Sequence, residues 1–348
     1  MSEHVLLEDA RWSCRACGKC CEGFSFGPVE PNIIQSLVDK KIAEHWPAAE
    51  KEWYSKHPQS GEYFLHHVDG HCIFLQEDKL CRIHALFGEE AKPWFCREYP
   101  FHVVEEPRGL AIRVREDCGG FHKSYLDGKP MAEHVAGVLR IPRVVARQQY
   151  KNMNVIILPG VAVSTDTWSK VEGVLLGYVK EEKQPHEIVQ TVRNKLLLMA
   201  GRQEQEGHPE KLTTIFASLL KYFVFSLQQL VVAPHITEKK QKLISLLQLA
   251  LANLSEPLGE IEPMLGRYFN LIIRGRLLGK TFASIGGIPN SLGLFLFETM
   301  MLRLAAGSDD VHVIGPMMSQ WRRIIMLQPI WLHLRKLEKP LTNLFLYA

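Results

Sequence analysis

The sequence predicts a mainly α-helical protein with two regions, a small irregular cysteine-rich domain followed by an all-helical domain. Two observations lead to this prediction. All eight cysteines lie between residues 14 and 118, and from about residue 130 apolar residues recur at the spacing of amphipathic helices. At 348 residues the chain can bury one large core or two ordinary ones. We therefore expect one domain at 1–128 and a second at 129–348.

The cysteine-rich region contains only short apolar segments. A proline start and the helical spacing of isoleucine and leucine predict a helix at 31–44, and a second helix is expected at about 48–57. Strands are expected at 72–75 and at 109–115, where apolar residues alternate with others. Short elements of this kind favour an irregular fold over a layered one.

Longer amphipathic helices follow in the second region. Thr165 or Asp166 is expected to cap a helix that runs to Val179, and Pro185 opens the next helix. The clearest apolar stripe in the chain follows Pro209. Gly, Pro, Ser and Asp residues separate the remaining expected helices, at 238–254, 261–280, 290–306, 316–327 and 330–346.

Two kinds of residue pairs in the helical region have a simple structural interpretation. The Met300-Met301 and Met317-Met318 pairs are expected to fill the core, because methionine at helical spacing usually packs. The Arg322-Arg323 pair is expected on a solvated helix face.

The charge balance gives little indication of a charged partner. A net charge of +3 arises from 41 basic and 38 acidic residues, which does not favour nucleic acid. The N-terminus has no signal-peptide pattern, and no apolar stretch is long enough to span a bilayer. We therefore expect a cytoplasmic protein, in which eight cysteines paired as disulfides would be out of place.

Four cysteines lie in one run of eight residues. A spacing of two residues lets Cys14, Cys17 and Cys20 turn their sulfurs onto one metal through a tight loop, and Gly18 supplies the backbone freedom. The side chains of Cys20 and Cys21 are neighbours that would usually point apart. We therefore expect these two to serve different metals or different edges of a cluster.

Four later cysteines complete a set of eight candidate ligands: Cys72, Cys81, Cys96 and Cys118. Eight thiolates could serve two four-ligand sites, or one iron–sulfur cluster and a zinc. The residue types do not choose between zinc and iron. The alternative to a metal ligand is a buried free thiol without a ligand role. This alternative is strongest for any single one of the later four cysteines. Bound metal is expected to stabilise the first domain.

Other residue types near the cysteines suggest supporting roles. Aromatic side chains at Trp94, Phe95, Tyr99 and Phe101 are expected to shield the metal site, and Arg97 to hydrogen-bond a sulfur or hold a carboxylate. Six histidines could replace or orient a thiolate, although a structural role is expected for each: His66, His67, His71, His84, His102 and His122. His84, three residues after Cys81, is the best candidate among them.

Two catalytic patterns are missing from the sequence. The CxxxCxxC motif of radical S-adenosylmethionine enzymes fails, because Phe24 stands where the third cysteine belongs. No glycine-rich strand–helix fingerprint for a nucleotide is visible either. The residues therefore single out no catalytic group and no cofactor-binding residue beyond the cysteines.

Together the cysteine motifs resemble a known family. Cys14-x-x-Cys17-Gly-x-Cys20-Cys21 is similar to the opening motif of the CxxCxxCC family, also called the YkgJ-type cysteine cluster, a zinc- or iron-chelating domain. Later elements extend the resemblance, at Gly70–Leu75, Cys81–His84, Pro93–Phe101 and Cys118–Gly119. The resemblance covers roughly the first third of the chain. It implies metal chelation by the eight cysteines and no known reaction.

One branch of this family is the flagellin lysine N-methylase, which joins such a cluster to a longer helical C-terminal region. The architecture here is similar, and residues 267–274 resemble a helical segment of that branch. The branch follows its later cysteine with Tyr-Pro-Arg, whereas this chain has Tyr99-Pro100-Phe101. The first hypothesis is therefore that this is a metal-binding protein. Its expected partners are metal ions and a protein, as a substrate or as a binding partner. The alternatives are an S-adenosylmethionine-dependent protein-lysine N-methyltransferase and a redox sensor.

Overall fold

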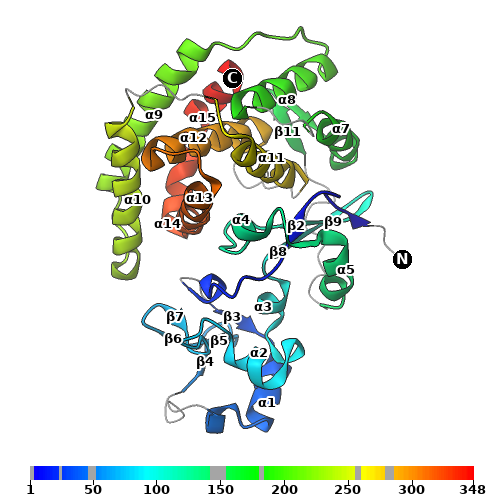
Figure 1. Cartoon of the computed structure of the whole chain (residues 1–348), viewed down its shortest axis with the longest axis vertical. Helices are drawn as coiled ribbons and strands as arrows, with labels where there is room; N and C mark the ends of the chain where they lie inside the picture. Colours follow the sequence, from blue (N-terminus) through cyan, green and yellow to red (C-terminus); the bar gives the residue numbers. More distant parts are fainter. Residues whose placement is uncertain are drawn as a thin grey trace.

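A computed structural model describes residues 4–22, 26–45, 52–141, 154–179, 184–254, 260–278 and 286–348. Long helices form one end of the molecule and cysteine-bearing segments the other, with short strands and helices between them (Figure 1). We call the described parts of 26–98 the cysteine-rich lobe, those of 4–22 and 101–141 the linking layer, and those of 154–348 the helical body.

The cysteine-rich lobe is built from short elements. Its sheet has the strand order β3 (Phe26–Val29), β5 (Tyr63–Leu65), β4 (Tyr54–Lys56), and both pairings are antiparallel. A hairpin joins β6 (His67–Val68) to β7 (His71–Cys72). The remaining elements are α1 (Pro31–Asp39), the 3-10 helix η2 (Ile42–His45), α2 (Arg82–Phe87), the 3-10 helix η3 (Glu89–Ala91) and α3 (Trp94–Glu98).

The structure corrects three predictions in this lobe. The helix expected at 31–44 ends at Asp39, because the backbone at Lys41 has a φ of 51°. The helix expected at 48–57 lies partly outside the described residues, and its described part contains β4, so that prediction is wrong there. Burial of Trp53 against Phe74, with ring centroids 5.6 Å apart, favours the extended backbone. The strand expected at 72–75 ends at Cys72.

The linking layer connects the lobe to the helices. Its sheet has the order β1 (His4–Val5), β9 (Gly109–Val114), β8 (Phe101–Glu106), with β1 parallel and β8 antiparallel to β9. The predicted strand at 109–115 is thus confirmed over 109–114. Short elements complete the layer: β2 (Arg11–Trp12) paired with β10 (Lys129–Pro130), the 3-10 helix η1 (Lys19–Cys21), α4 (Phe121–Ser124) and α5 (Met131–Leu139).

The helical body follows the predicted order of helices. They are α7 (Thr165–Tyr178), α8 (Pro185–Met199), α9 (Pro209–Gln229), α10 (Pro234–Ala252), α11 (Pro263–Leu278), α12 (Ile288–Ala306), α13 (Val311–Ile325), α14 (Gln328–Leu334), the 3-10 helix η5 (Arg335–Leu337) and α15 (Glu338–Tyr347). Ser164, rather than Thr165 or Asp166, caps α7 by accepting a hydrogen bond from the Thr167 amide. Met301 and Met318 are fully buried, which confirms their packing role.

Three features of residues 129–348 differ from the expected all-helical domain. β10 belongs to a two-stranded sheet, and β11 (Val155–Leu158) forms a hairpin with β12 (Val161–Val163) around a turn with Gly160 at φ 74°. Helix α13 begins at Val311, five residues before the expected start, and Asp310 caps it by accepting a hydrogen bond from the His312 amide. Pro316, where the helix was expected to begin, lies inside it. The single helix expected at 330–346 is divided into α14, η5 and α15.

Buried apolar side chains form two clusters. The smaller lies in the lobe and includes Leu37, Phe74 and Ile83. The larger contains linking-layer residues such as Ile112 and Phe121 together with the helical body. Most of the linking layer therefore shares its core with the helices, while Cys21 packs against the lobe core. The domain boundary at 128/129 stays a prediction, because it concerns which segments fold independently. Within the described residues, no helix has both the length and the apolar character of a membrane span.

Candidate metal centre

The first cysteine loop, residues 14–21, packs against the lobe. Gly18 has a φ of 67°, and a Cβ at this position would lie 3.2 Å from the Cβ of Lys79. Both the backbone conformation and the space therefore favour glycine, as its position between the cysteines predicts. The loop ends in η1, which contains Cys20 and Cys21. Cys20 is exposed and Cys21 is half-buried.

Backbone pairing brings three cysteine segments together. An isolated antiparallel bridge joins Glu22 to His71, so the neighbouring residues Cys21 and Cys72 lie beside each other. A second isolated bridge holds Cys81, at the start of α2, against the turn that follows β7. Segments far apart in the sequence thus place their thiols in one part of the lobe.

The sulfurs of Cys20 and Cys21 face each other. Their Sγ atoms lie 3.9 Å apart, so the expectation that these side chains point apart is wrong. Rotation about the Cα–Cβ bond lets adjacent thiols turn toward a common point. Two sulfurs bound to one zinc lie about 3.8 Å apart, which is the edge of a tetrahedron with Zn–S bonds of about 2.3 Å. The observed separation is compatible with one shared ion.

Further thiols belong to the same neighbourhood. The Cys21 thiol, which lies beside Cys72, interacts electrostatically with Cys72 and Cys81. Cys96, on α3, interacts electrostatically with Cys81, Cys21 and Cys20. We call these five residues the main thiol group. They come from η1, the end of β7, the start of α2 and α3.

Cys17 and Cys118 lie near each other in the linking layer. A Cβ built on Gly119 would lie 3.2 Å from the Cys17 sulfur, and one on Gly120 would lie 3.7 Å from the Cys118 sulfur. Gly119 therefore allows the Cys118 loop to approach the first cysteine loop closely, whereas the contacts at Gly120 are ordinary van der Waals contacts. The charge of Cys17 also acts on Cys118. Cys14, which opens the first loop, is exposed.

Four of these thiols, at Cys20, Cys21, Cys96 and Cys118, hold their protons tightly. A hydrogen bond from Cys20 lowers the pKa of Cys21, but contact with the Cys72 thiol, burial and nearby charges outweigh it and raise this pKa to about 12. The hydrogen bond to Cys21 together with burial raises the pKa of Cys20. Burial raises the pKa of Cys96, and it raises that of Cys118 to about 11. A metal binding here must displace protons.

The chemistry of this donor set fits zinc or iron. Thiolates in groups of four are the ligands of closed zinc sites and of iron–sulfur clusters. Within the described residues, however, no group of three or more His, Cys, Asp or Glu side chains is arranged to hold a metal ion. The thiols are therefore gathered together without being set in a coordination geometry, and binding requires their side chains to turn.

The histidines are distributed around the centre. His84 is exposed on α2, whereas His71, directly before Cys72 on β7, has a buried Nδ1 that lacks a hydrogen-bond partner in the described structure. His122, on α4, is buried against Gly315 of α13, and neither ring nitrogen has such a partner. Burial lowers the pKa of His122 to about 4.

The aromatic residues that are expected to shield the metal site pack in two different places, and their shielding role stays a prediction. Phe95 packs on the lobe core, and Phe101 is buried in the larger core with its ring 5.2 Å from that of Trp12. Arg97 holds a carboxylate, since its guanidinium lies 2.6 Å from Glu90. The expectation of an ion pair at Arg97 is thus confirmed, and its guanidinium is buried.

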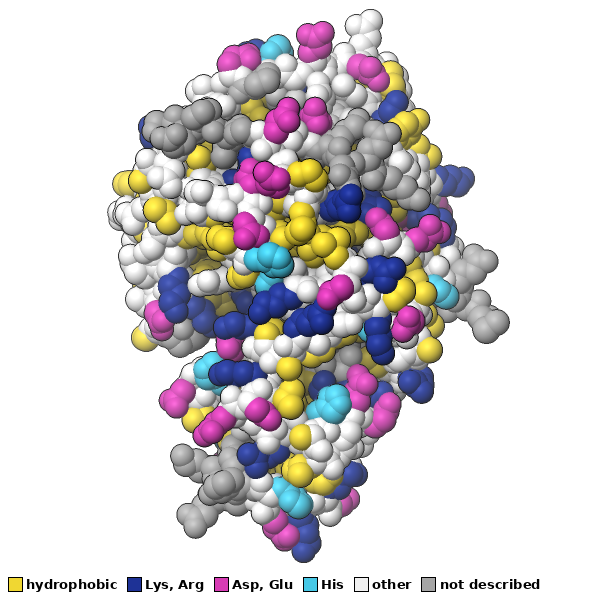
Figure 2. All heavy atoms as spheres, viewed as in Figure 1, with side chains coloured by type: hydrophobic (Ala, Val, Ile, Leu, Met, Phe, Trp, Pro, Cys, Tyr) yellow, Lys and Arg dark blue, Asp and Glu magenta, His cyan; other side chains and the backbone are white. Residues whose placement is uncertain are grey.

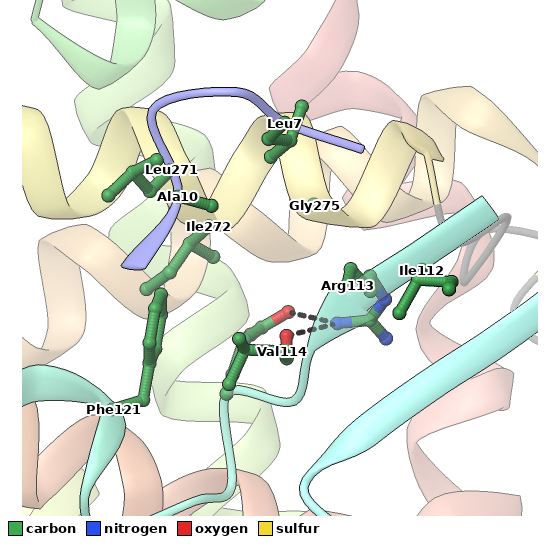
Figure 3. Close-up of a pocket in the computed structure, with 10 residues that line it drawn as sticks. Leu7, Ala10, Ile112, Arg113, Val114, Phe121, Leu271, Ile272 and Gly275 are labelled. Atoms are coloured by element: carbon green, nitrogen blue, oxygen red, sulfur yellow. Dashed lines mark hydrogen bonds and ion pairs between the residues drawn. The ribbon is translucent and has the colours of Figure 1, made fainter. Parts of the chain in front are cut away.

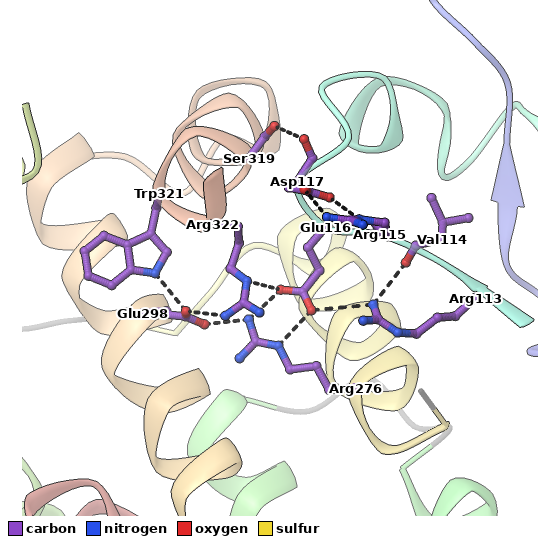
Figure 4. Close-up of polar contacts among 10 residues, drawn as sticks. All are labelled: Arg113, Val114, Arg115, Glu116, Asp117, Arg276, Glu298, Ser319, Trp321 and Arg322. Atoms are coloured by element: carbon purple, nitrogen blue, oxygen red, sulfur yellow. Dashed lines mark hydrogen bonds and ion pairs between the residues drawn. The ribbon is translucent and has the colours of Figure 1, made fainter. Parts of the chain in front are cut away.

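The Arg322-Arg323 pair is not on a solvated face, which corrects the prediction. Arg322 is 12% exposed and contacts Glu298 at 3.0 Å and Glu116 at 3.4 Å. These residues belong to a buried network in which Arg276 donates through Nε to Glu116 at 2.9 Å and through Nη2 to Glu298 (Figure 4). Burial would raise the pKa of Glu116, but Arg276, Arg322 and Arg113 hold it well below its usual range. The sequence carries no signal for this network, because its members lie far apart.

Two cavities lie in the linking layer and the helical body. One of about 20 Å³ lies between the N-terminal segment, β9 and α11, and is lined mainly by apolar side chains with Arg113 at its edge (Figure 3). Only a molecule the size of water fits this volume. The other, a groove of about 470 Å³, separates α10 from α13 and has Leu246, Met317 and Ile324 on its walls.

Comparison with known proteins supports the interpretation of the cysteines. No curated protein and no solved structure matches this chain. One family model does match, over residues 13–119, and this segment contains all eight cysteines. The cysteine-bearing segment 13–119 therefore matches the CxxCxxCC family, whose description is "putative zinc- or iron-chelating domain".

Proposed function

We propose that the protein chelates zinc or iron through the main thiol group, with Cys17 and Cys118 contributing to a second site. One observation carries this proposal. Thiols from the first cysteine loop and from three segments of the lobe converge, and the sulfurs of Cys20 and Cys21 lie 3.9 Å apart. Free structural cysteines pack as scattered small hydrophobes and have no reason to converge in this way.

The eight cysteines are proposed as ligands in two sets. The main thiol group offers five sulfurs, more than one tetrahedral ion needs, which allows either a zinc with a spare thiolate or an iron–sulfur cluster. Cys14, Cys17 and Cys118 form the second proposed set. Because Cys118 lies in the larger core and Cys72 in the lobe core, metal at both sets would fasten the first cysteine loop to both parts.

Metal analysis of anaerobically purified protein tests this proposal. We expect bound zinc or iron, and absorption in the visible region if the metal is an iron–sulfur cluster. The variant Cys72→Ser should lose the metal of the main thiol group, while Ser36→Ala, at a half-buried position of α1, serves as the control. Protein without metal, in which all eight thiols titrate freely, would contradict the proposal.

The protein-lysine N-methyltransferase remains a prediction from resemblance. Its direct test is calorimetric titration of the metal-loaded protein with S-adenosylmethionine. Binding in the micromolar range would support the methyltransferase, and the absence of any heat of binding at ligand excess would remove it. Chelation by the main thiol group does not depend on this result.

A further inference from the structure

Arg323 lies near the C-terminal end of α13, far along the chain from the segment that matches the family model. Its guanidinium donates to the backbone carbonyl oxygens of Lys19 and Glu22. These two carbonyls flank Cys20 and Cys21 in the sequence. The side chain of one helical residue therefore fixes the backbone on both sides of the adjacent thiols.

The same guanidinium also holds the loop that leads to Cys118. Its Nε donates to the carbonyl oxygen of Asp117 at 2.8 Å, and its Nη2 lies 3.3 Å from the hydroxyl of Tyr99. The Tyr99 hydroxyl donates to the same Asp117 carbonyl at 3.0 Å, and Ser319 donates to it at 3.1 Å. Asp117 directly precedes Cys118.

One side chain thus connects both thiol sets. The planar guanidinium presents several donors in a fixed geometry, which a lysine ammonium does not reproduce. The positive charge also acts on Cys20 and favours its thiolate over its thiol. Lys and Arg side chains gather across the middle of this face, where the helical body meets the lobe (Figure 2).

We propose that Arg323 is a positioning residue of the metal centre, which holds the first cysteine loop and the Cys118 loop in the relative placement that metal binding requires. This inference rests on the proposed chelating function. It assigns part of the metal centre to the helical body, outside the segment 13–119. The cysteine-rich segment would then depend on α13 to bind metal at full affinity.

Three variants of the full-length protein test the inference. Arg323→Gln removes the charge and most donors, and Arg323→Lys keeps the charge alone. Arg303→Gln is the control, since Arg303 is another arginine of the helical body that is itself buried and pairs with Asp309, at the opposite end of α13. The two ends of this helix are about 20 Å apart at 1.5 Å per residue.

Zinc affinity is measured for each variant by competition with a chromogenic chelator, alongside thermal unfolding of the metal-free protein. We expect Arg323→Gln to bind zinc about 10- to 100-fold more weakly than the wild type, which is the usual effect of losing a residue that orients metal ligands. Arg323→Lys should recover part of the affinity. Arg303→Gln should lower stability while leaving zinc affinity unchanged.

The outcomes separate this inference from the proposed function. A wild type that binds no metal contradicts the proposed function itself. A wild type that binds metal, with Arg323→Gln equal to it in affinity, overturns only the positioning role. If Arg323→Gln does not fold, Arg323→Lys decides, because wild-type affinity in that variant would show that the guanidinium geometry is not required.

Discussion

The cysteine-rich lobe and the helical body differ in what their sequences bury. The lobe has short strands and helices around a few large side chains such as Leu37 and Phe74. The helical body packs long helices, including α9, α11 and α12, around a continuous apolar core. A small core gains little free energy from burial, so a lobe of this kind needs another source of stability. The gathered thiols offer one, because metal binding contributes directly to folding.

The two regions also treat polar groups differently. The lobe, together with the first cysteine loop, gathers neutral thiols whose protons must leave before metal binds. The helical body and Glu116 of the linking layer bury a charged network with Arg276, Glu298 and Arg322, in which each charge has an opposite partner. Such a network is costly to break but adds no ligand. Bound metal should therefore determine the stability of the lobe, whereas ion pairing should determine the stability of the helical body.

Removal of metal is expected to have the largest effect, and mainly in the lobe. Structural zinc contributes about 10–16 kcal/mol of apparent binding free energy in small zinc domains. Removal of the metal with a chelator should therefore expose the amides of β5, α2 and α3 to hydrogen exchange, while α9 and α12 keep their protection. Exchange followed by mass spectrometry measures this. Equal loss of protection in lobe and body would break the comparison.

Loss of one buried charge is expected to have the next largest effect, now in the helical body. Glu298→Gln leaves Arg276 and Arg322 with one buried carboxylate fewer, which costs about 3–5 kcal/mol for a broken buried pair. Urea unfolding measures the change. Glu238→Gln is the control, because its partner Lys242 and its own side chain are exposed. If both variants unfold at the same urea concentration, the network does not stabilise the body.

The smallest expected effect is a pH dependence at His122, where the linking layer meets α13. Burial lowers its pKa in the folded state to about 4, below the value of 6.5 for an unperturbed histidine. Above pH 6.5 the histidine is neutral in both the folded and the unfolded protein. As the pH drops from 6.5 toward 4 the unfolded protein binds a proton that the folded protein does not, so the free energy of unfolding falls. The loss at pH 5 is about 1–2 kcal/mol.

Thermal unfolding of the metal-free protein at pH 7 and pH 5 measures this contribution. His122→Asn should lose less stability between the two pH values than the wild type. His84→Asn, at an exposed position, should behave like the wild type. An unchanged pH slope in His122→Asn would show that other groups cause the acid sensitivity.

Local sequence signals were sufficient for the elements that depend on local chemistry. Pro185 and Pro209 mark the starts of α8 and α9, and the apolar stripe after Pro209 predicts a long buried face. The cysteine spacing predicted the matched segment. The β11–β12 hairpin was missed although its β-branched runs flank Pro159-Gly160, which is a turn signal.

Features that depend on distant contacts could not be predicted. Nothing in the Arg322-Arg323 pair indicates that one guanidinium meets Glu298 and Glu116 while the other meets the carbonyls of two cysteine loops. The convergence of Cys20 and Cys21 depends on rotamers and on the lobe that surrounds them. Spacing identifies candidate ligands, whereas the tertiary fold determines which of them meet.

The main thiol group can be tested most directly by mapping thiol protection in the full-length protein. Zinc-loaded and chelator-treated samples are alkylated for a short time, and each cysteine is quantified by mass spectrometry. We predict that Cys20, Cys21, Cys72, Cys81 and Cys96 are protected together by zinc and react together once it is removed. Reaction of these five thiols at the same rates with and without zinc would contradict the account.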